Sequence, residues 1–189
     1  MLQWNSTDVG TSGGAFASDG VITTLTGRGA DVWGTSDQFR YAYRDWSMID
    51  GSLTVRVRSV QNVNAWTKAG IMLREVAPSG GAQETNARYV FLMVTPGKGV
   101  AMQYRSASGG AAASAGTTAG VAPGWLRVTR SGDTYTGSWS KDGLTWTSVG
   151  SISLPLNRIL LSAGVAVSSH SSAAATASFD DVRLDAAPR

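Results

Sequence analysis

Aromatic rings beside polar groups are the residues in this sequence best suited to contact a ligand. Trp33 and Trp66 fall at expected strand ends or in loops, close to polar side chains such as Gln38. The face of an indole ring packs on the C–H face of a sugar ring, while amide, guanidinium and imidazole groups hydrogen-bond the sugar hydroxyls. We therefore expect Trp33 and Trp66 to contact a ligand, whereas Trp139 and Trp146 are expected to pack in the core or over a turn.

Carboxylates are the second group that could do chemistry. A glycosidase needs two of them flanking the scissile bond, but only two of the thirteen acidic residues are glutamate, and no Glu-x-Asp-x-Glu type of pair occurs. Asp31 and Asp37, near the aromatic residues, and Glu75, at a strand end, are the best catalytic candidates. Aspartates just before strands are usually turn formers, so catalysis is the alternative here and not the expectation.

A structural calcium ion is a further candidate, because Ca²⁺ takes oxygen ligands from carboxylates and carbonyls. Asp8, and Asp180 in the Phe-Asp-Asp run at 179–181, are the expected ligands. Adjacent strand residues point to opposite faces, so at most one of two neighbouring aspartates binds directly; a solvated strand edge is the other interpretation. The chain has no cysteine and a single histidine, which excludes disulfides and cysteine-rich or multi-histidine metal sites.

Composition excludes several classes of partner. With 189 residues, of which 42% are hydrophobic and 15% charged, the chain can form one globular domain with a real core. The net charge is +3, but Lys and Arg form no stripe, so nucleic acid is not expected as a partner. No apolar stretch reaches the roughly 18 residues of a membrane span.

The N-terminus is not a signal peptide. Met1 is expected to be an added start on an excised domain, and the tail 184–189 is expected to be the beginning of a linker.

Alternation of apolar and polar residues dominates the chain, and no segment shows a convincing helical period. Turn signals such as Asp-Gly at 19–20, 50–51 and 142–143 separate the runs. The expected strands span 21–27, 39–44, 52–60, 68–75, 87–95, 99–106, 125–132, 134–140, 145–151, 159–169 and 177–184. This spacing predicts one all-β domain over 1–189, a sandwich or a barrel. The Gly-, Ala- and Ser-rich segment 106–124 is expected to be a flexible loop within it.

Strand alternation also assigns faces. On three strands one face is apolar and is expected to form the core: Leu53, Val55, Val57, Ala69, Ile71, Leu73, Leu161, Ala163, Val165 and Val167. The opposite face carries Gly70, Gly164 and Ala166, with Arg74 and His170 further along. In one curved sheet these small residues would open a shallow trough lined by the polar groups. The alternative is that they only ease packing against a loop.

The segment 140–146, Ser-Lys-Asp-Gly-Leu-Thr-Trp, matches the Asp-box pattern of sialidase propellers. Asp142-Gly143 favours a hairpin turn with positive φ, and Trp146 can pack over that turn. The pattern occurs once, and a chain of this length cannot supply several propeller blades. We therefore interpret it as a structural hairpin.

Several segments together resemble a known group of domains: GRGADVWGTSDQFRYAY (27–43), VRSVQNVNAWTKAGIMLRE (57–75), MVTPGKGVAMQYR (93–105) and WLRVTRSGDTYTGSWSKDGLTW (125–146). In order and spacing they are similar to the concanavalin A-like jelly-roll domains related to the DUF1349 and "regulation of enolase" group, over nearly the whole chain. Such domains are accessory modules of secreted bacterial glycoside hydrolases and other multidomain surface proteins. The resemblance implies a β-sandwich of two antiparallel sheets, one concave, with any glycan on the concave face or its rim.

Our leading hypothesis is a non-catalytic carbohydrate-binding module from a secreted, multidomain bacterial enzyme. The expected partners are a polysaccharide or oligosaccharide and a covalently linked catalytic domain, and the chain itself is expected to be a monomer that needs no cofactor beyond the candidate calcium. The expected ligand-binding residues are Trp33, Gln38, Trp66, Arg74, Gln103, Arg105 and His170.

Two alternatives stay open at the level of sequence. One is a glycoside hydrolase or polysaccharide lyase of the same fold that uses Asp31, Asp37 or Glu75. The other is a structural or protein-binding sandwich, which a concave face filled by side chains would favour. Fold alone cannot choose among the three.

Overall fold

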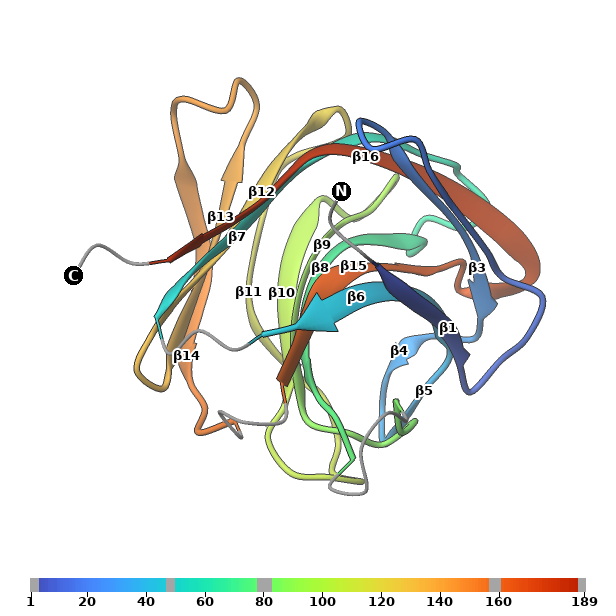
Figure 1. Ribbon diagram of the computed structural model, residues 1–189, viewed down its shortest axis with the longest axis horizontal. Coiled ribbons are helices and arrows are strands. Elements are labelled where there is room, and N and C mark those ends of the chain that lie inside the picture. The colour runs from blue at the N-terminus through green and yellow to red at the C-terminus, as the bar shows by residue number, and fades with distance from the viewer. Residues whose placement is uncertain (1–3, 47–49, 78–82, 157–160, 187–189) are drawn as a thin grey trace.

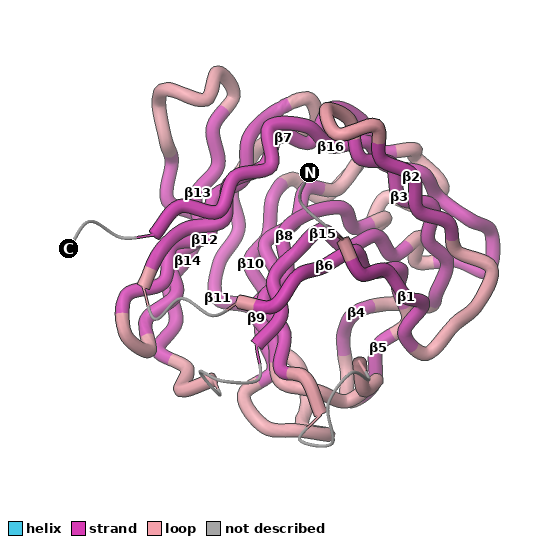
Figure 2. The backbone as a smooth tube through the Cα atoms, in the orientation of Figure 1, coloured by secondary structure: helices cyan, strands magenta, loops and turns pink. Residues whose placement is uncertain are grey.

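The computed structural model describes residues 4–46, 50–77, 83–156 and 161–186, and every regular element in these ranges is a strand. Figure 2 shows these strands joined by loops and turns. Within the same ranges we find no helix of the length and hydropathy that crossing a bilayer requires. The all-β prediction is confirmed.

Fourteen of the strands form two antiparallel sheets of seven strands each, which face one another (Figure 1). Sheet A has the order β1-β6-β15-β8-β9-β10-β11. Its strands are β1 (Asn5–Val9), β6 (Phe39–Asp45), β15 (Leu161–Ser168), β8 (Lys68–Glu75), β9 (Tyr89–Val94), β10 (Val100–Arg105) and β11 (Ala113–Thr118).

Sheet B has the order β14-β13-β12-β7-β16-β3-β2. Its strands are β14 (Thr147–Ser153), β13 (Thr134–Ser140), β12 (Gly124–Ser131), β7 (Gly51–Val60), β16 (Ser171–Ala186), β3 (Thr23–Gly29) and β2 (Ala15–Ser18). The long β16 arcs over sheet A in Figure 1. A separate two-stranded hairpin consists of β4 (Val32–Trp33) and β5 (Ser36–Asp37).

The core lies between the sheets, and the predicted phase of the strands is confirmed. All ten residues expected to face the core belong to one buried hydrophobic cluster that both sheets supply. Burying aliphatic and aromatic side chains of this size is the main source of stability in such a sandwich. Trp46 and Phe179 are among the largest side chains completely buried in the described part of the chain.

The eleven predicted strands correspond to observed strands, although residues 159–160 of one of them lie outside the described residues. The prediction missed β1, β2 and the β4–β5 hairpin. It was also wrong about segment 106–124, which contains strand β11. This strand pairs with β10 from Val100↔Thr118 to Tyr104↔Ala113, with a register shift between Met102 and Gln103.

Close packing explains why β11 has the composition of a loop. A Cβ atom on Gly116 would collide with the Val149 carbonyl oxygen of β14, and one on Gly150 would press on the Ala115 carbonyl oxygen. β11 and β14 close the same side of the sandwich from different sheets, so only glycine and small residues fit between them. Here a Gly- and Ala-rich segment marks a close approach and not flexibility.

The 140–146 segment forms a structural turn between β13 and β14, as its sequence predicts. The Asp142 carboxylate accepts hydrogen bonds from the amides of Leu144 and Thr145, each at 2.8 Å, and from the Ser140 hydroxyl at 3.0 Å. Gly143 has φ of +77°, and the Arg127 guanidinium lies 3.8 Å from the centre of the Trp146 ring. The backbone amides of Thr145 and Leu144, with the Ser140 hydroxyl, lower the pKa of Asp142 below its ordinary value of 3.8.

A change of Asp142 to Ala should destabilise the protein in a pH-dependent way. Because the folded-state pKa is lowered, the stabilisation is complete above about pH 4 and is lost as the pH falls through the folded-state value. We expect the difference in unfolding free energy between wild type and Asp142→Ala to be larger at pH 7 than at pH 3, as measured by urea denaturation. Asp185→Ala, which removes an exposed carboxylate from β16, serves as the control. An equal difference at both pH values would contradict this assignment.

Candidate functional site

The outer face of sheet A, where the sequence predicts the ligand, is covered. A second buried hydrophobic cluster lies on this face, to which Tyr41, Met72, Phe91, Met93 and Ala166 belong, all with 0% exposure. These side chains fill the space above the small residues of β8 and β15. The expected open trough is therefore absent over this part of the sheet, because neighbouring strands supply bulky side chains to the same face.

The β4–β5 hairpin is the element that covers this face. Val32 is completely buried in the second cluster, and its carbonyl oxygen accepts a hydrogen bond from the Lys68 ammonium group at 2.9 Å. The backbone closes the hairpin through the Gln38 amide, which donates to the Asp31 carbonyl oxygen at 2.8 Å. Two short strands thus act as a lid that packs on the sheet through the apolar side chain of Val32.

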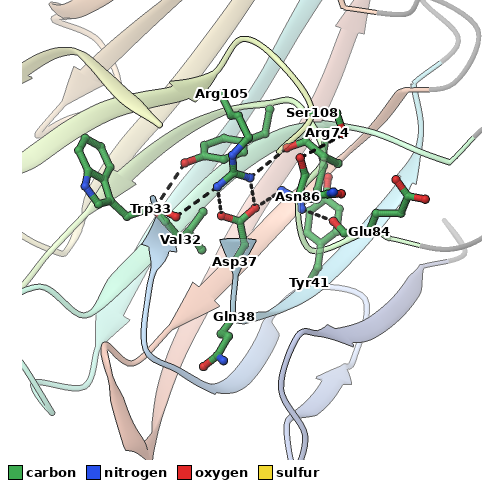
Figure 3. A network of polar contacts seen from close by, with 12 residues as sticks. Val32, Trp33, Asp37, Gln38, Tyr41, Arg74, Glu84, Asn86, Arg105 and Ser108 are labelled. Atoms are coloured by element: carbon green, nitrogen blue, oxygen red, sulfur yellow. Dashed lines mark hydrogen bonds and ion pairs between the residues drawn. The ribbon is translucent and has the colours of Figure 1, made fainter. Parts of the chain in front are cut away.

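A buried ion-pair network, which we call the Asp37 clamp, fixes this lid to the sheet (Figure 3). Asp37, at the end of β5, contacts Arg74 of β8 at 2.8 Å and Arg105 of β10 at 2.6 Å, all three with 0% side-chain exposure. Arg105 uses two nitrogens, since its Nη2 also donates to Asp37 Oδ1 at 2.7 Å. This paired geometry is among the strongest that a carboxylate makes in a protein.

Backbone carbonyls accept hydrogen bonds from most of the remaining arginine donors of the clamp, while Arg74 Nε has no hydrogen-bond partner among the described residues. Arg105 donates to the carbonyl oxygens of Trp33 (3.2 Å), Gly34 (3.1 Å), Ala87 (3.1 Å) and Gly110 (2.9 Å), and Arg74 donates to that of Glu84. Burial lowers the pKa of Arg74, while the Asp37 charge opposes that effect. The clamp thereby joins the lid and two loops to the sheet.

The arginines predicted to bind a ligand are therefore structural. Arg74 and Arg105 have no exposed surface, and the Asp37 carboxylate and backbone carbonyls engage them. Gln103 is 6% exposed and accepts a hydrogen bond from Lys68 at 2.9 Å. None of the three reaches solvent to a degree that would allow a polysaccharide to contact it.

At the rim of the lid, a cluster of polar side chains is partly exposed to solvent. Lys68, itself 1% exposed, pairs with Asp31 at 2.6 Å, and the other Asp31 oxygen lies 3.4 Å from Nδ1 of the half-buried His170. Burial lowers the pKa of Lys68, and the Asp31 charge opposes that shift. Trp33 is 39% exposed, and the Lys68 ammonium lies 5.7 Å from its ring centre. The rim thus offers one exposed indole beside groups that already have partners.

The two other predicted contact residues lie on neighbouring loops. Trp66 is half-buried, with the Lys98 ammonium 5.8 Å from its ring centre. Gln38 is exposed, and its side-chain oxygen accepts a hydrogen bond from the Ala30 amide at 3.0 Å. Their ligand contacts stay predictions.

The carboxylates proposed for catalysis all have basic partners. Asp37 lies in the clamp, Asp31 pairs with Lys68, and Glu75 lies 3.1 Å from Arg88. Asp37 is moreover sealed from solvent. A carboxylate held between arginines and excluded from solvent cannot serve as the acid or base of a glycosidase.

The two predicted calcium ligands also pair with arginines. Asp8 lies 3.5 Å from Arg40 and accepts a hydrogen bond from the Gly14 amide at 3.1 Å, and Asp180 lies 3.1 Å from Arg58. Among the described residues no group of three or more acidic or histidine side chains gathers in a way that could hold a metal ion. The calcium site stays a sequence prediction without a ligand set in this part of the chain.

An open cleft lies elsewhere, where β16 extends beyond its neighbour β3. β16 pairs with β3 only as far as Phe179↔Thr23, whereas its pairing with β7 continues to Ala186↔Gly51. Beyond Phe179 the described residues place no strand on that side of β16. The cleft at this edge has a volume of about 1040 Å³, compared with about 480 and 530 Å³ for two other hollows. We call it the edge cleft; its main lining residues are Trp4, Phe16, Arg44, Arg56, Trp125, Asp180 and Asp181.

Aromatic rings and guanidinium groups alternate along the edge cleft. The Arg44 guanidinium lies 4.5 Å from the ring centre of Trp4, and that of Arg56 lies 4.9 Å from the ring centre of Trp125. The Trp125 indole nitrogen also donates to Asp181 at 3.4 Å. These four side chains are half-buried, so each presents part of its surface to the cleft.

Sequence reasoning missed this site because strand register creates it. Trp125, Arg56 and Asp180 are separated by more than fifty residues in sequence but lie directly opposite one another on β12, β7 and β16. Trp4 meets Arg44 because β1 pairs with β6, with Asn5 opposite Tyr43. The tryptophans were the one available signal, and Trp125 falls at a predicted strand end.

Comparison with known proteins identifies the fold of the chain but not its function. No protein-family model matches the chain, and no curated protein does. Among solved structures, a functionally unknown protein from Saccharomyces cerevisiae superposes with a TM-score of 0.70 at 17% identity, over 93% of each chain. The GH43 protein BlXynB from Bacillus licheniformis gives 0.64 at 16% identity, over 88% of this chain and 33% of its own.

A third solved structure has a similar fold. The exoplasmic/lumenal domain of VIP36, in a form bound to Ca²⁺ and Man3GlcNAc, gives a TM-score of 0.57 at 12% identity, over 98% of this chain and 86% of that domain. The fold is a jelly-roll sandwich of the concanavalin A-like type. At these identities the likeness shows the fold alone, and the narrower resemblance to the DUF1349 group stays a prediction. The chain spans about a third of the length of BlXynB.

Neutralising the clamp carboxylate should cost much of the protein's stability. Asp37→Asn leaves two buried arginines without their counter-charge, and breaking a buried ion pair typically costs about 3–5 kcal/mol. We expect a drop of this size in the unfolding free energy measured by urea denaturation. Arg58→Gln removes a partly exposed pair with Asp180 and should cost less than about 1 kcal/mol. Similar, small losses for the two variants would show that the clamp is not a stabilising element.

Proposed function

We propose that this chain is a non-catalytic carbohydrate-binding module whose sugar site is the edge cleft. The observation that carries the proposal is the lining of that cleft, where Trp4 and Trp125 lie among guanidinium and carboxylate groups. Aromatic surface beside fixed hydrogen-bonding groups is the combination that sugars require. The volume of about 1040 Å³ is large enough for more than one sugar ring, because drug-sized ligands occupy about 300–1,000 Å³.

The carboxylates of the cleft argue for binding and against catalysis. Asp180 pairs with Arg58 at 3.1 Å and with Arg56 at 3.8 Å, and Asp181 pairs with Arg183 at 2.9 Å. A glycosidase uses two carboxyl groups that reach the scissile bond, whereas arginine side chains already engage both of these carboxylates.

Fold likeness supports the wider context of the proposal. The chain corresponds to about a third of BlXynB, and VIP36 has been captured with a bound mannose-containing glycan. We accordingly propose that the chain is one module of a longer, secreted protein and carries its linked catalytic domain to a polysaccharide.

One observation favours a second candidate, a purely structural or protein-binding sandwich. The outer face of sheet A is filled by side chains and covered by the β4–β5 hairpin. This is the arrangement expected of a structural or protein-binding domain. The edge cleft is what distinguishes the two functions, since a structural domain has no need for it.

Affinity gel electrophoresis across a panel of neutral and acidic polysaccharides tests the proposal. We expect at least one polymer to retard the wild type, and Trp125→Ala to weaken that binding about tenfold or more, since a central tryptophan is often worth ~2 kcal/mol of binding energy. Trp146→Ala is the matched control, because Trp146 is also half-buried under an arginine but lies outside the cleft.

A third variant locates the binding site. Trp33→Ala removes the exposed indole at the rim of sheet A and should leave affinity unchanged. Loss of binding in Trp33→Ala with none in Trp125→Ala would place the sugar at the rim and overturn the assignment to the edge cleft. Unretarded migration of the wild type on every polymer would favour the structural sandwich.

A further inference from the structure

Arg44 lies over an indole ring that also lines the edge cleft. Its guanidinium carbon lies 4.5 Å from the Trp4 ring centre, and Trp4 in turn packs against the main hydrophobic core. A guanidinium that rests on a supported aromatic ring has little freedom to rotate. Its N–H edge is then oriented in advance for a planar anion, which lowers the entropy lost on binding.

The other arginines of the cleft already have acidic partners. Arg56 pairs with Asp180 and Arg183 with Asp181. In the adjoining β2–β3 turn, the Asp19 carboxylate accepts hydrogen bonds from the amides of Val21 and Ile22 at 2.8 and 2.7 Å. Within the described ranges no ion pair joins Arg44 to a carboxylate, so the cleft carries one uncompensated positive charge.

We propose that Arg44 binds a negatively charged group of the ligand, the carboxylate of a uronic acid in an acidic polysaccharide. The inference rests on the proposed function, since it assigns a ligand class to the same cleft. A carboxylate matches the guanidinium because two parallel N–H···O bonds join the two planar groups. Trp125 supplies the apolar surface on which a sugar ring of the same polymer packs.

The surroundings of Arg44 support this assignment. Burial lowers the pKa of Arg44, because its charged form loses hydration on folding. An anion beside it restores the missing interaction. The net charge of +3 adds a weak general attraction for polyanions, so the experiment must separate Arg44 from charge in general.

Matched arginine variants and matched polymers make that separation. Arg44→Gln and Arg127→Gln each remove one arginine stacked on a tryptophan, but Arg127 lies on Trp146 outside the cleft. Polygalacturonate is compared with its methyl-esterified form, which has the same backbone without the charge. Dextran sulfate and dextran form a second pair, which distinguishes a carboxylate from a sulfate. Binding is measured by isothermal titration calorimetry at 150 mM salt.

We expect wild type and Arg127→Gln to bind polygalacturonate equally, and Arg44→Gln to bind it about tenfold or more weakly, since a charged hydrogen bond contributes roughly 1.5–3 kcal/mol. The methyl ester should bind about as weakly to the wild type as the acid does to Arg44→Gln. Arg44→Lys keeps the charge without the planar fork and should bind with intermediate affinity. If Arg44→Gln proves unstable in a thermal melt, Arg44→Lys still tests whether Arg44 binds the carboxylate.

Four results would overturn the inference. Equal losses in Arg44→Gln and Arg127→Gln would show attraction by overall charge alone, and binding of dextran sulfate in preference to polygalacturonate would replace the carboxylate with a sulfate. Binding of a neutral polymer that depends on Trp125 but not on Arg44 would leave the proposed function standing and remove only its acidic ligand. Absence of binding to any polymer would remove both.

Discussion

The charge of Asp37 is the constraint on which one side of this sandwich depends. A single carboxylate, completely buried, holds two arginines from strands two places apart in sheet A. Arg105 donates to the carbonyl oxygens of Trp33, Gly34, Ala87 and Gly110, and Arg74 to that of Glu84, so the two arginines fix a lid and two loops. An ion pair taken out of water is costly unless further hydrogen bonds satisfy its remaining donors, and here backbone carbonyls accept from most of the donors that the carboxylate does not reach. The network thereby holds the lid over the buried apolar cluster on this face of sheet A.

The clamp also explains where the sequence-based interpretation of the site failed. Strand alternation correctly put Arg74 on the face away from the main core, and a polar face beside tryptophans is a reasonable description of a sugar site. Alternation cannot tell an exposed face from one that another segment covers. The short hairpin that covers it contributes Val32 and Asp37, and a two-residue strand leaves no periodic pattern to detect.

The fold was more accessible to prediction because it depends on local signals repeated many times. Most long strands showed a period of two, and the core residues of β7, β8 and β15 followed from it. What escaped were features set by contacts between distant segments. β11 has a loop-like composition because Gly116 lies against β14, and the edge cleft exists because Arg56 lies between Trp125 and Asp180 in the sheet. Neither the position of β11 nor the edge cleft can be predicted from the sequence without knowing the register of the strands.

The unpaired part of β16 has a consequence for how the molecule meets copies of itself. A long strand edge with free amides and carbonyls invites another strand to add to the sheet. Here the edge beyond Phe179 carries charged side chains, among them Asp180, Asp181 and Arg183, and Asp181 adopts φ of +52° where the register with β7 shifts. A bulge and alternating charges make such an edge a poor template for pairing. The residues that form one wall of the edge cleft therefore also protect the sheet from growing by addition of a second chain.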